Sequence, residues 1–272
     1  GGRAEGDRQI WVHLAGDLVR GASGRGDRVI GSITDITEKK FNEAKITQLA
    51  YWDSLTGLPN RMRFKELLQE AMEERVKDGK KLAVMMIDLD RFKIVNDTLG
   101  HQTGDLLLQL ASAKLQECVG PHGIVARFAG DEFIALLSRI EGAEEINRIA
   151  DRMLLMLTKP FVLEGQEFYL SASLGACMYP CDAKDVDSLI RFSDLAMYYS
   201  KENGGNRLKV YTPALSSKRV ERFNMETGLR HALERGELAL NFQPQVSLVS
   251  GKVYGAETLI RWSSSDGKTI QP

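Results

Sequence analysis

The alternation of hydrophobic and polar positions divides the chain into a long middle segment, where helices and strands alternate, and two shorter flanking segments. In the middle segment, residues 82–88 are apolar enough to be buried on both faces of a sheet, and a polar loop is expected after them. The turn Gly130-Asp131 predicts a tight hairpin. This alternation predicts an α+β sandwich with a central, largely antiparallel sheet flanked by helices. The expected helices are 61–77, 104–118, 143–157 and 186–202, and the expected strands are 82–88, 124–128, 132–137, 161–163, 167–178 and 207–211.

The flanking segments have simpler patterns. Before the middle segment, two short strands surround the Gly-rich residues 21–27, and a charged helical pattern then predicts a connector helix. After it, a helix and two strands begin a second unit that is not completed, so we expect the chain to be part of a longer protein. The expected elements are strands 10–14 and 28–36, helix 37–52, helix 213–235, and strands 238–245 and 252–262.

Composition and charge exclude several classes of protein. The 272 residues are 43% hydrophobic and contain no apolar run long enough to cross a bilayer. Lys and Arg number 36 against 37 Asp and Glu, which argues against a broad surface for binding nucleic acid. Three scattered cysteines predict no disulfide framework, and the four histidines form no zinc motif. We therefore expect a cytoplasmic location, with any anionic ligand bound locally.

Two groups of acids stand where apolar strands meet turns. The first is Asp88-Leu89-Asp90 and the second is Asp131-Glu132. Carboxylates at the ends of buried strands are costly unless they are paired or bound to a cation, and Mg²⁺ prefers such ligands together with substrate phosphates. The alternative is that all four acids are solvated turn residues. A calcium-binding EF-hand loop starting at Asp88 is excluded, because Phe92 and Lys93 occupy the positions of a ligand and a glycine.

Two further polar residues follow the first acidic group. Asn96 offers a donor and an acceptor and Asp105 accepts two N–H groups, so the pair could read the edge of guanine. They could equally be a turn residue and a helix cap. The segment 91–93 places backbone N–H groups and a lysine directly after the strand, where they could surround a triphosphate.

Residues 53–212 carry a resemblance to a known family. The matching segments are Asp53-Ser54-Leu55-Thr56-Gly57-Leu58-Pro59-Asn60-Arg61, Ile87-Asp88-Leu89-Asp90-Arg91-Phe92-Lys93, and Arg127-Phe128-Ala129-Gly130-Asp131-Glu132-Phe133. With these segments the chain resembles the GGDEF family of diguanylate cyclases. The resemblance implies a fold similar to nucleotidyl cyclases and polymerase palms. It also implies condensation of two GTP molecules to cyclic di-GMP and two pyrophosphates, by two-metal-type phosphoryl transfer across a homodimer that the connector helix could assemble.

The resemblance also implies roles for individual residues, with Mg²⁺ or Mn²⁺ as the cofactor. The implied metal ligands are Asp88, Leu89 through its carbonyl, Asp131 and Glu132, of which Asp131 and Glu132 are also the catalytic pair. The implied GTP-binding residues are Asn96, Asp105, Phe92, Lys93 and Lys201.

Three departures from the family pattern bear on activity. Ala129 replaces the first glycine of the motif. If that position needs a positive φ, the alanine strains the backbone, and if it lies against the nucleotide, the methyl group crowds it. In either case we expect weaker activity. Gly205 stands where the family often has an arginine that helps Lys201 to hold phosphates. The family's product-inhibition motif falls on Gly120-Pro121-His122-Gly123, so feedback through that site should be absent.

The flanking segments resemble two further modules. Residues 1–36 and the linker helix 37–52 resemble the end of a PAS sensor domain joined to a signalling helix, although a plain linker is an open alternative. With Leu238-Ala239-Leu240-Asn241-Phe242-Gln243-Pro244-Gln245 and Gly255-Ala256-Glu257-Thr258-Leu259-Ile260-Arg261-Trp262, residues 213–272 resemble the start of a truncated EAL phosphodiesterase domain. The resemblance implies that Glu257 is a metal ligand, and the alternative is a satisfied acid at the end of a strand. We expect a cyclase with GTP, cyclic di-GMP and its own EAL domain as partners. The alternative is a GTP-binding regulatory domain with little turnover that controls the EAL domain.

Overall fold

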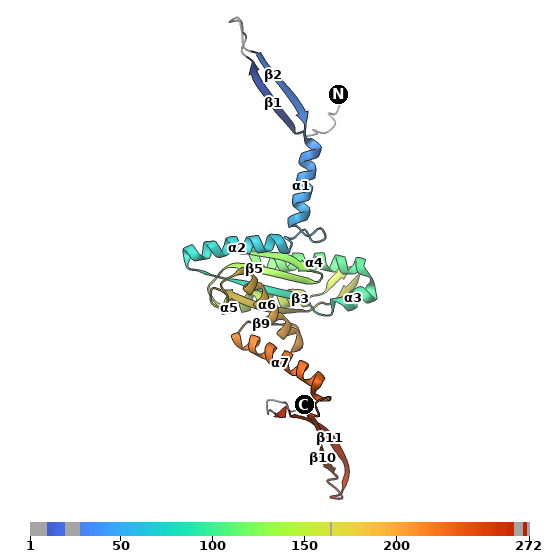
Figure 1. Cartoon of the computed structure of the whole chain (residues 1–272). Helices are drawn as coiled ribbons and strands as arrows, with labels where there is room; N and C mark the ends of the chain where they lie inside the picture. The colour runs from blue at the N-terminus through green and yellow to red at the C-terminus, as the bar shows by residue number, and fades with distance from the viewer. Residues whose placement is uncertain (1–9, 20–27, 164, 264–268, 271–272) are drawn as a thin grey trace. The chain divides into compact units, whose positions relative to one another are not determined.

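The computed structural model describes residues 10–19, 28–163, 165–263 and 269–270, and it divides the chain into two compact units, 1–211 and 212–272 (Figure 1). The Gly-rich segment 21–27 lies outside the described residues. The first unit begins with the antiparallel pair β1 (Val12–Val19) and β2 (Arg28–Asp35), followed by the connector helix α1 (Thr37–Tyr51). The first strand therefore lies later than the predicted residues 10–14.

The rest of the first unit contains the alternating helices and strands. The helices are α2 (Arg61–Asp78), α3 (Phe92–Leu99), α4 (His101–Val119), the 3-10 turn η1 (Gly120–His122), α5 (Ala143–Thr158) and α6 (Val186–Glu202). The strands are β3 (Lys81–Leu89), β4 (Gly123–Ala129), β5 (Glu132–Ile140), β6 (Phe161–Leu163), β7 (Gln166–Phe168), β8 (Ala172–Tyr179) and β9 (Arg207–Val210).

A five-stranded sheet in the order β4-β5-β3-β8-β9 forms the centre of this unit. The pairings β4 with β5, β5 with β3 and β3 with β8 are antiparallel, and only the pairing of β8 with β9 is parallel. The predicted α+β fold with a largely antiparallel central sheet is therefore confirmed. Strand β3 is central, and every residue after Lys81 is buried. A strand covered on both faces needs no polar alternation, which explains its continuous apolar sequence.

Helices cover both faces of the sheet, and alternate residues of β3 point to opposite sides. Ala83, Met85 and Ile87 pack in one core cluster with side chains of α4 and α5. The residues between them, including Asp88, point to the opposite face of the sheet, where α6 contacts β3 and β8 and α2 contacts β3. The position of Asp88 along β3 thus directs its side chain to the face that α6 covers.

Two predicted boundaries are wrong. The expected polar loop after β3 contains the helix α3, and α4 already begins at His101. Arg91 has a left-handed backbone with φ of 58°, which turns the chain directly from strand to helix, and the buried Phe92 holds α3 against the core. The expected single strand 167–178 is broken, because β7 pairs with β6 in a separate sheet while β8 joins the central sheet.

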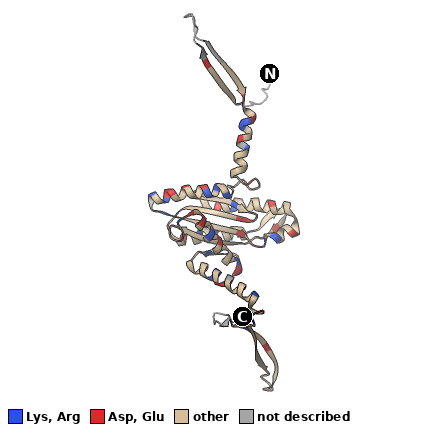
Figure 2. Cartoon of the chain, viewed as in Figure 1, with Lys and Arg blue, Asp and Glu red and all other residues tan. Residues whose placement is uncertain are grey.

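The second unit contains α7 (Pro213–Ala232) and a sheet of β10 (Leu238–Val246), β11 (Val253–Ser263) and β12 (Thr269–Ile270). Within the described ranges, no helix has the length and apolar character needed to span a membrane. Figure 2 shows basic and acidic residues mixed along helices such as α2, in agreement with the nearly neutral net charge.

Candidate active site

Asp88 lies near the end of the central strand, where three strands meet. The antiparallel register places it opposite Glu132 of β5 on one side and Ser173 of β8 on the other. Its side chain is only 7% exposed. A carboxylate this well buried requires a cation or hydrogen-bond donors.

Lys201, in the last turn of α6, supplies that cation. Its Nζ lies 2.7 Å from Asp88 Oδ1 and 2.9 Å from Oδ2. Burial raises the pKa of Asp88 and the nearby Asp131 and Asp90 add to this effect, while Lys201 opposes it. For Lys201, burial favours the neutral form, but the ion pair with Asp88 outweighs it and the pKa is raised. The structure thus brings Lys201 to the acidic cluster itself.

The second acidic pair lies on the neighbouring strand. Burial raises the pKa of Glu132, and the carboxylates of Asp88, Asp194 and Asp131 raise it further. The backbone carbonyl of Asp131 accepts a hydrogen bond of 3.4 Å from the Leu89 N–H, so the hairpin turn and the end of β3 are joined. Asp88, Leu89, Asp131 and Glu132, all proposed from sequence, therefore lie together at one end of the sheet.

This donor set fits a hard divalent cation. Burial is the main cause of the raised pKa of Asp88 and of Glu132, and neighbouring carboxylates raise both further, so a bound cation would favour the ionised forms. Over the described ranges, no group of three or more His, Cys, Asp or Glu side chains converges as a metal site. Mg²⁺ requires only one or two carboxylates, because waters and substrate phosphates complete its shell.

Asp90 has a different environment, although it stands only two residues after Asp88. Its Oδ2 accepts a hydrogen bond of 2.7 Å from Ser171 Oγ and one of 3.1 Å from the Asn206 N–H. Its Oδ1 accepts a bond of 2.7 Å from Ser173 Oγ. Asp90 thus ties the end of β3 to the start of β8 and to the loop after α6. The sequence pattern grouped Asp90 with the other acids and did not predict that it joins these segments. The two serines at positions 171 and 173 were the signal in the sequence that could have indicated this role.

Two of the three departures from the family pattern, Ala129 and Gly205, have structural explanations. Ala129 ends strand β4, and the positive φ of 49° in the turn belongs to Gly130. The expected backbone cost at Ala129 therefore does not arise. Gly205 has a φ of 66°, and a Cβ there would lie 2.9 Å from Asp90 Oδ2. A side chain at this position would have to displace the carboxylate that holds the loop.

The predicted GTP-binding residues near α3 occupy one region. Asn96 is half-buried on α3, and Asp105 is exposed in the first turns of α4. Lys93 is exposed, whereas the side chain of Phe92 is only 4% exposed and packs in the core. Only the backbone of Phe92 is therefore available to a nucleotide.

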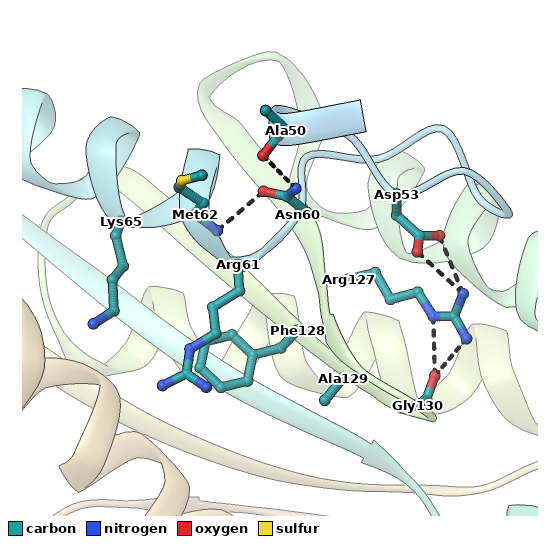
Figure 3. A pocket seen from close by; sticks show the side chains of 10 residues that line it. All are labelled: Ala50, Asp53, Asn60, Arg61, Met62, Lys65, Arg127, Phe128, Ala129 and Gly130. Carbon is teal, nitrogen blue, oxygen red and sulfur yellow. Dashed lines mark hydrogen bonds and ion pairs between the residues drawn. The ribbon is translucent and has the colours of Figure 1, made fainter. Parts of the chain in front are cut away.

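Arg127 is a residue of the motif to which sequence reasoning assigned no role. Its Nη1 lies 3.1 Å from Asp53 Oδ1, while its Nε and Nη2 donate to the Gly130 carbonyl at 2.9 and 2.8 Å (Figure 3). Burial favours the neutral form of Asp53, but hydrogen bonds from Thr56 and Arg127 outweigh it and lower its pKa. The guanidinium thus fixes the turn that precedes Asp131.

A pocket of about 810 Å³ lies beside this turn, and the Arg61 guanidinium stacks 4.6 Å from the Phe128 ring centroid at its wall (Figure 3). None of the predicted site residues lines it. The lining residues are Ala50, Asp53, Asn60, Arg61, Met62, Lys65, Arg127, Phe128, Ala129 and Gly130.

Glu257, the candidate ligand in the second unit, lies on β11 opposite Gln243 of β10. Its side chain is exposed. In the described part of this unit, no group of three or more His, Cys, Asp or Glu side chains forms a metal site around it.

Comparisons with known proteins identify both units. Residues 50–207 match the family model described as "Diguanylate cyclase, GGDEF domain", and residues 226–272 match the model of the EAL domain. The GGDEF domain of TpbB (YfiN) from Pseudomonas aeruginosa is 33% identical, with a TM-score of 0.60 over 63% of this chain and 99% of that one. A sensory box/GGDEF family protein from Caulobacter crescentus is 38% identical, with a TM-score of 0.54 over 57% and 99%.

Curated relatives are longer proteins. The cyclic di-GMP phosphodiesterase NbdA of Pseudomonas aeruginosa is 37% identical over 80% of this chain and 28% of its own length. The cyclic di-GMP phosphodiesterase PdeR of Escherichia coli is 36% identical over 94% and 38%. The bifunctional diguanylate cyclase/cyclic di-GMP phosphodiesterase MucR of Pseudomonas aeruginosa is 35% identical over 84% and 33%. The chain thus spans about a third of the length of these relatives.

Proposed function

Because the chain belongs to the diguanylate cyclase GGDEF-domain family, followed by the start of an EAL domain, we propose that residues 53–212 form a diguanylate cyclase domain. Its reaction joins two GTP molecules into cyclic di-GMP and releases two pyrophosphates. The observation that carries the proposal is the cluster of Asp88, Asp131 and Glu132 at one end of the sheet, with Lys201 against Asp88.

The residues of this cluster have distinct tasks. Asp88, Asp131, Glu132 and the Leu89 carbonyl would hold Mg²⁺ or Mn²⁺, which when bound polarises the phosphoryl group and favours ionisation of the attacking 3′-hydroxyl. Lys201 pairs with Asp88, and its ammonium group would also contact the phosphates of GTP. Lys93 and the backbone N–H groups after β3 surround the phosphates.

Recognition of the base belongs to the region of α3 and α4. Asn96 offers an amide and Asp105 a carboxylate, which match the donors and acceptors on the edge of guanine. Each domain holds one GTP, so two copies must face each other for each 3′-hydroxyl to reach the other α-phosphorus. The working enzyme is thus a homodimer.

Incubation with GTP and Mg²⁺ tests the proposal, with cyclic di-GMP as the measured product. We expect Asp131→Asn to lower the rate about 100-fold or more, because a charged ligand of the metal ion that would polarise the reacting phosphoryl group is lost. Asp151→Asn, at an exposed position on α5, is the matched control and should retain the wild-type rate. Undiminished turnover in Asp131→Asn would contradict the assigned role.

A second function is a domain that binds GTP with little turnover and controls the adjoining EAL phosphodiesterase. Two observations favour it: Gly205 stands where the family often has an arginine, and two relatives are named phosphodiesterases. Tight GTP binding with no product over many hours, in a chain that includes the whole EAL domain, would decide for this function. In that chain GTP should change the rate of cyclic di-GMP hydrolysis.

The remaining assignments complete the proposal. We assign residues 1–36 to a PAS-like remnant, 37–52 to a signalling helix, and 213–272 to the beginning of the EAL domain, with Glu257 as one of its metal ligands. Partners are GTP, cyclic di-GMP, a second copy of the chain and the EAL domain, and the location is cytoplasmic. Limited proteolysis followed by mass spectrometry would test the boundaries, since exposed linkers are cut first.

A further inference from the structure

Gly104, in the first turns of α4, has an unusual neighbour. It is buried and has an ordinary helical backbone rather than a positive φ. A Cβ at this position would lie less than 3.0 Å from Asn96 Oδ1 and 3.1 Å from Asn96 Cγ, with Phe92 Cζ at 3.3 Å. Real Cβ atoms do not approach neighbours this closely, so the side chain of Asn96 fits only because residue 104 has none.

Gly100 provides an internal comparison, since it lies one helical turn earlier. It has a φ of 83°, and a Cβ there would meet nothing within 4 Å. Gly100 is therefore required for the backbone turn between α3 and α4. Gly104 is required because the Asn96 side chain occupies the space that a Cβ of residue 104 would fill.

The contact with Gly104 fixes where the Asn96 amide lies. Asn96 is half-buried, and its Oδ1 occupies the place that a Cβ of residue 104 would take, so packing against the backbone of α4 limits where its amide lies. Asp105 is the residue directly after Gly104. The distance between amide and carboxylate is thus set by the close approach of Asn96 to the backbone of α4.

We propose that Gly104 is a positioning residue for base recognition, which places the Asn96 amide beside Asp105 so that the two together select guanine over adenine. This rests on the proposed function, in which Asn96 and Asp105 bind GTP. Alanine normally stabilises a helix relative to glycine, so a loss caused by Gly104→Ala cannot come from helix propensity. It must come from displacement of Asn96 or Phe92.

The experiment measures the affinities of the full chain for GTP and for ATP by calorimetry, with Mg²⁺ present. Gly104→Ala should weaken GTP binding about tenfold, the effect of losing one hydrogen bond of about 1.4 kcal/mol, and should leave ATP binding unchanged. Asn96→Ala should produce a similar loss. Gln102→Ala, at an exposed position in the first turn of α4, is the matched control and should bind as wild type.

The double variant Asn96→Ala/Gly104→Ala separates positioning from general damage. If Gly104 acts through Asn96, the double variant binds GTP as Asn96→Ala does, because interacting residues are not additive. Additive losses would overturn the proposal. If Gly104→Ala alone fails to fold, recovery of folding in the double variant supports a steric clash between the new Cβ and the Asn96 side chain. Failure of both variants to fold overturns the proposal.

The same measurements distinguish failure of the proposed function from failure of the inference about Gly104. Absence of GTP binding by the wild type, or an unchanged affinity in Asn96→Ala, would refute the role of Asn96 and the inference with it. Weaker binding in Asn96→Ala, together with wild-type affinity and selectivity in Gly104→Ala, would refute the inference alone.

Discussion

At the scale of single residues, two aspartates have opposite surroundings, although Asp88 lies on β3 and Asp90 directly follows that strand. Asp88 faces a single lysine and other carboxylates, and its pKa is raised by burial. The Asp90 carboxylate accepts hydrogen bonds from two serine hydroxyl groups and one backbone N–H. The first carboxylate therefore suits the proposed role of a cation ligand, whereas the second already accepts hydrogen bonds from three protein groups.

Asp53 provides a prediction about stability and pH. Its pKa is lowered by hydrogen bonds from Thr56 and Arg127 that outweigh its burial, so it stabilises the fold at pH values above its unfolded pKa, and this contribution is lost as the pH falls through the folded pKa. We expect Asp53→Asn to lower the free energy of unfolding by about 1–3 kcal/mol at pH 7. The difference from wild type should stay constant down to about pH 5 and shrink below about pH 4.

Urea unfolding at several pH values checks this prediction. Asp151→Asn, at an exposed position on α5, serves as the control and should differ from wild type by a few tenths of a kcal/mol at most. A loss in Asp53→Asn that is equally large below pH 3 would show that the ion pair with Arg127 is not its source.

At the scale of elements, the approach of α6 to the sheet places Lys201. Gly175 of β8 lies against the backbone of α6, where a Cβ would come within 3.0 Å of Met197 N and Ser193 O. Lys201 follows Met197 by about one helical turn. The absence of a side chain at residue 175 therefore allows the helix to lie close enough for Lys201 to reach Asp88.

Gly175→Ala should accordingly affect both the fold and the site. Because the obstructing atoms belong to backbone, α6 must move, and we expect a loss of about 3 kcal/mol or more in the free energy of unfolding. Ala176→Gly on the same strand is a control for the general effect of changing a small residue there, and it should cost about 1 kcal/mol. Equal stability of Gly175→Ala and wild type would show that the helix tolerates the shift.

The connector helix α1 exposes apolar side chains that a second copy could cover. Phe41, Ile46 and Leu49 are 66%, 67% and 61% exposed. Burying one such side chain in a dimer contributes about 1.5–3 kcal/mol, so Leu49→Glu should weaken dimerisation at least about tenfold and lower the cyclase rate in proportion.

Analytical ultracentrifugation and product formation measure the two effects of Leu49→Glu. Lys45→Glu, a charge change on the same helix, is the control for altered net charge. If Leu49→Glu leaves the dimer population at wild-type level, α1 does not form the interface.

At the scale of the whole molecule, ligand binding and folding are linked. A ligand at 100 times its dissociation constant stabilises the folded state by about 2.7 kcal/mol. For a domain of this size, that corresponds to a rise of about 5–10 °C in Tm. We expect this rise with GTP and Mg²⁺ but a smaller one with ATP, measured by differential scanning calorimetry.

This thermal shift is expected from both candidate functions, because each requires GTP binding. A chain that serves only for dimerisation and binds no nucleotide, a third alternative, would show no such shift. Asn96→Ala should reduce the shift with GTP and leave the ligand-free Tm near that of the wild type.

The sequence alone determined the fold class and the location of the acidic groups. Hydrophobic periodicity separates helices from strands locally, and the apolar run of β3 required burial on both faces, so Asp88 had to lie at a buried strand end. The motif placed Asp131 and Glu132 on the adjacent hairpin. Local pattern was less informative after β3, where polar residues concealed the short helix α3.

Only the tertiary structure decided which distant residues meet. The pairing of Lys201 with Asp88 joins positions 113 residues apart, and the three partners of Asp90 come from two other segments. The fit of Asn96 against Gly104 depends on how α3 and α4 turn about Gly100. These contacts depend on strand register and helix packing, which are set by the whole core and have no counterpart in the local sequence pattern.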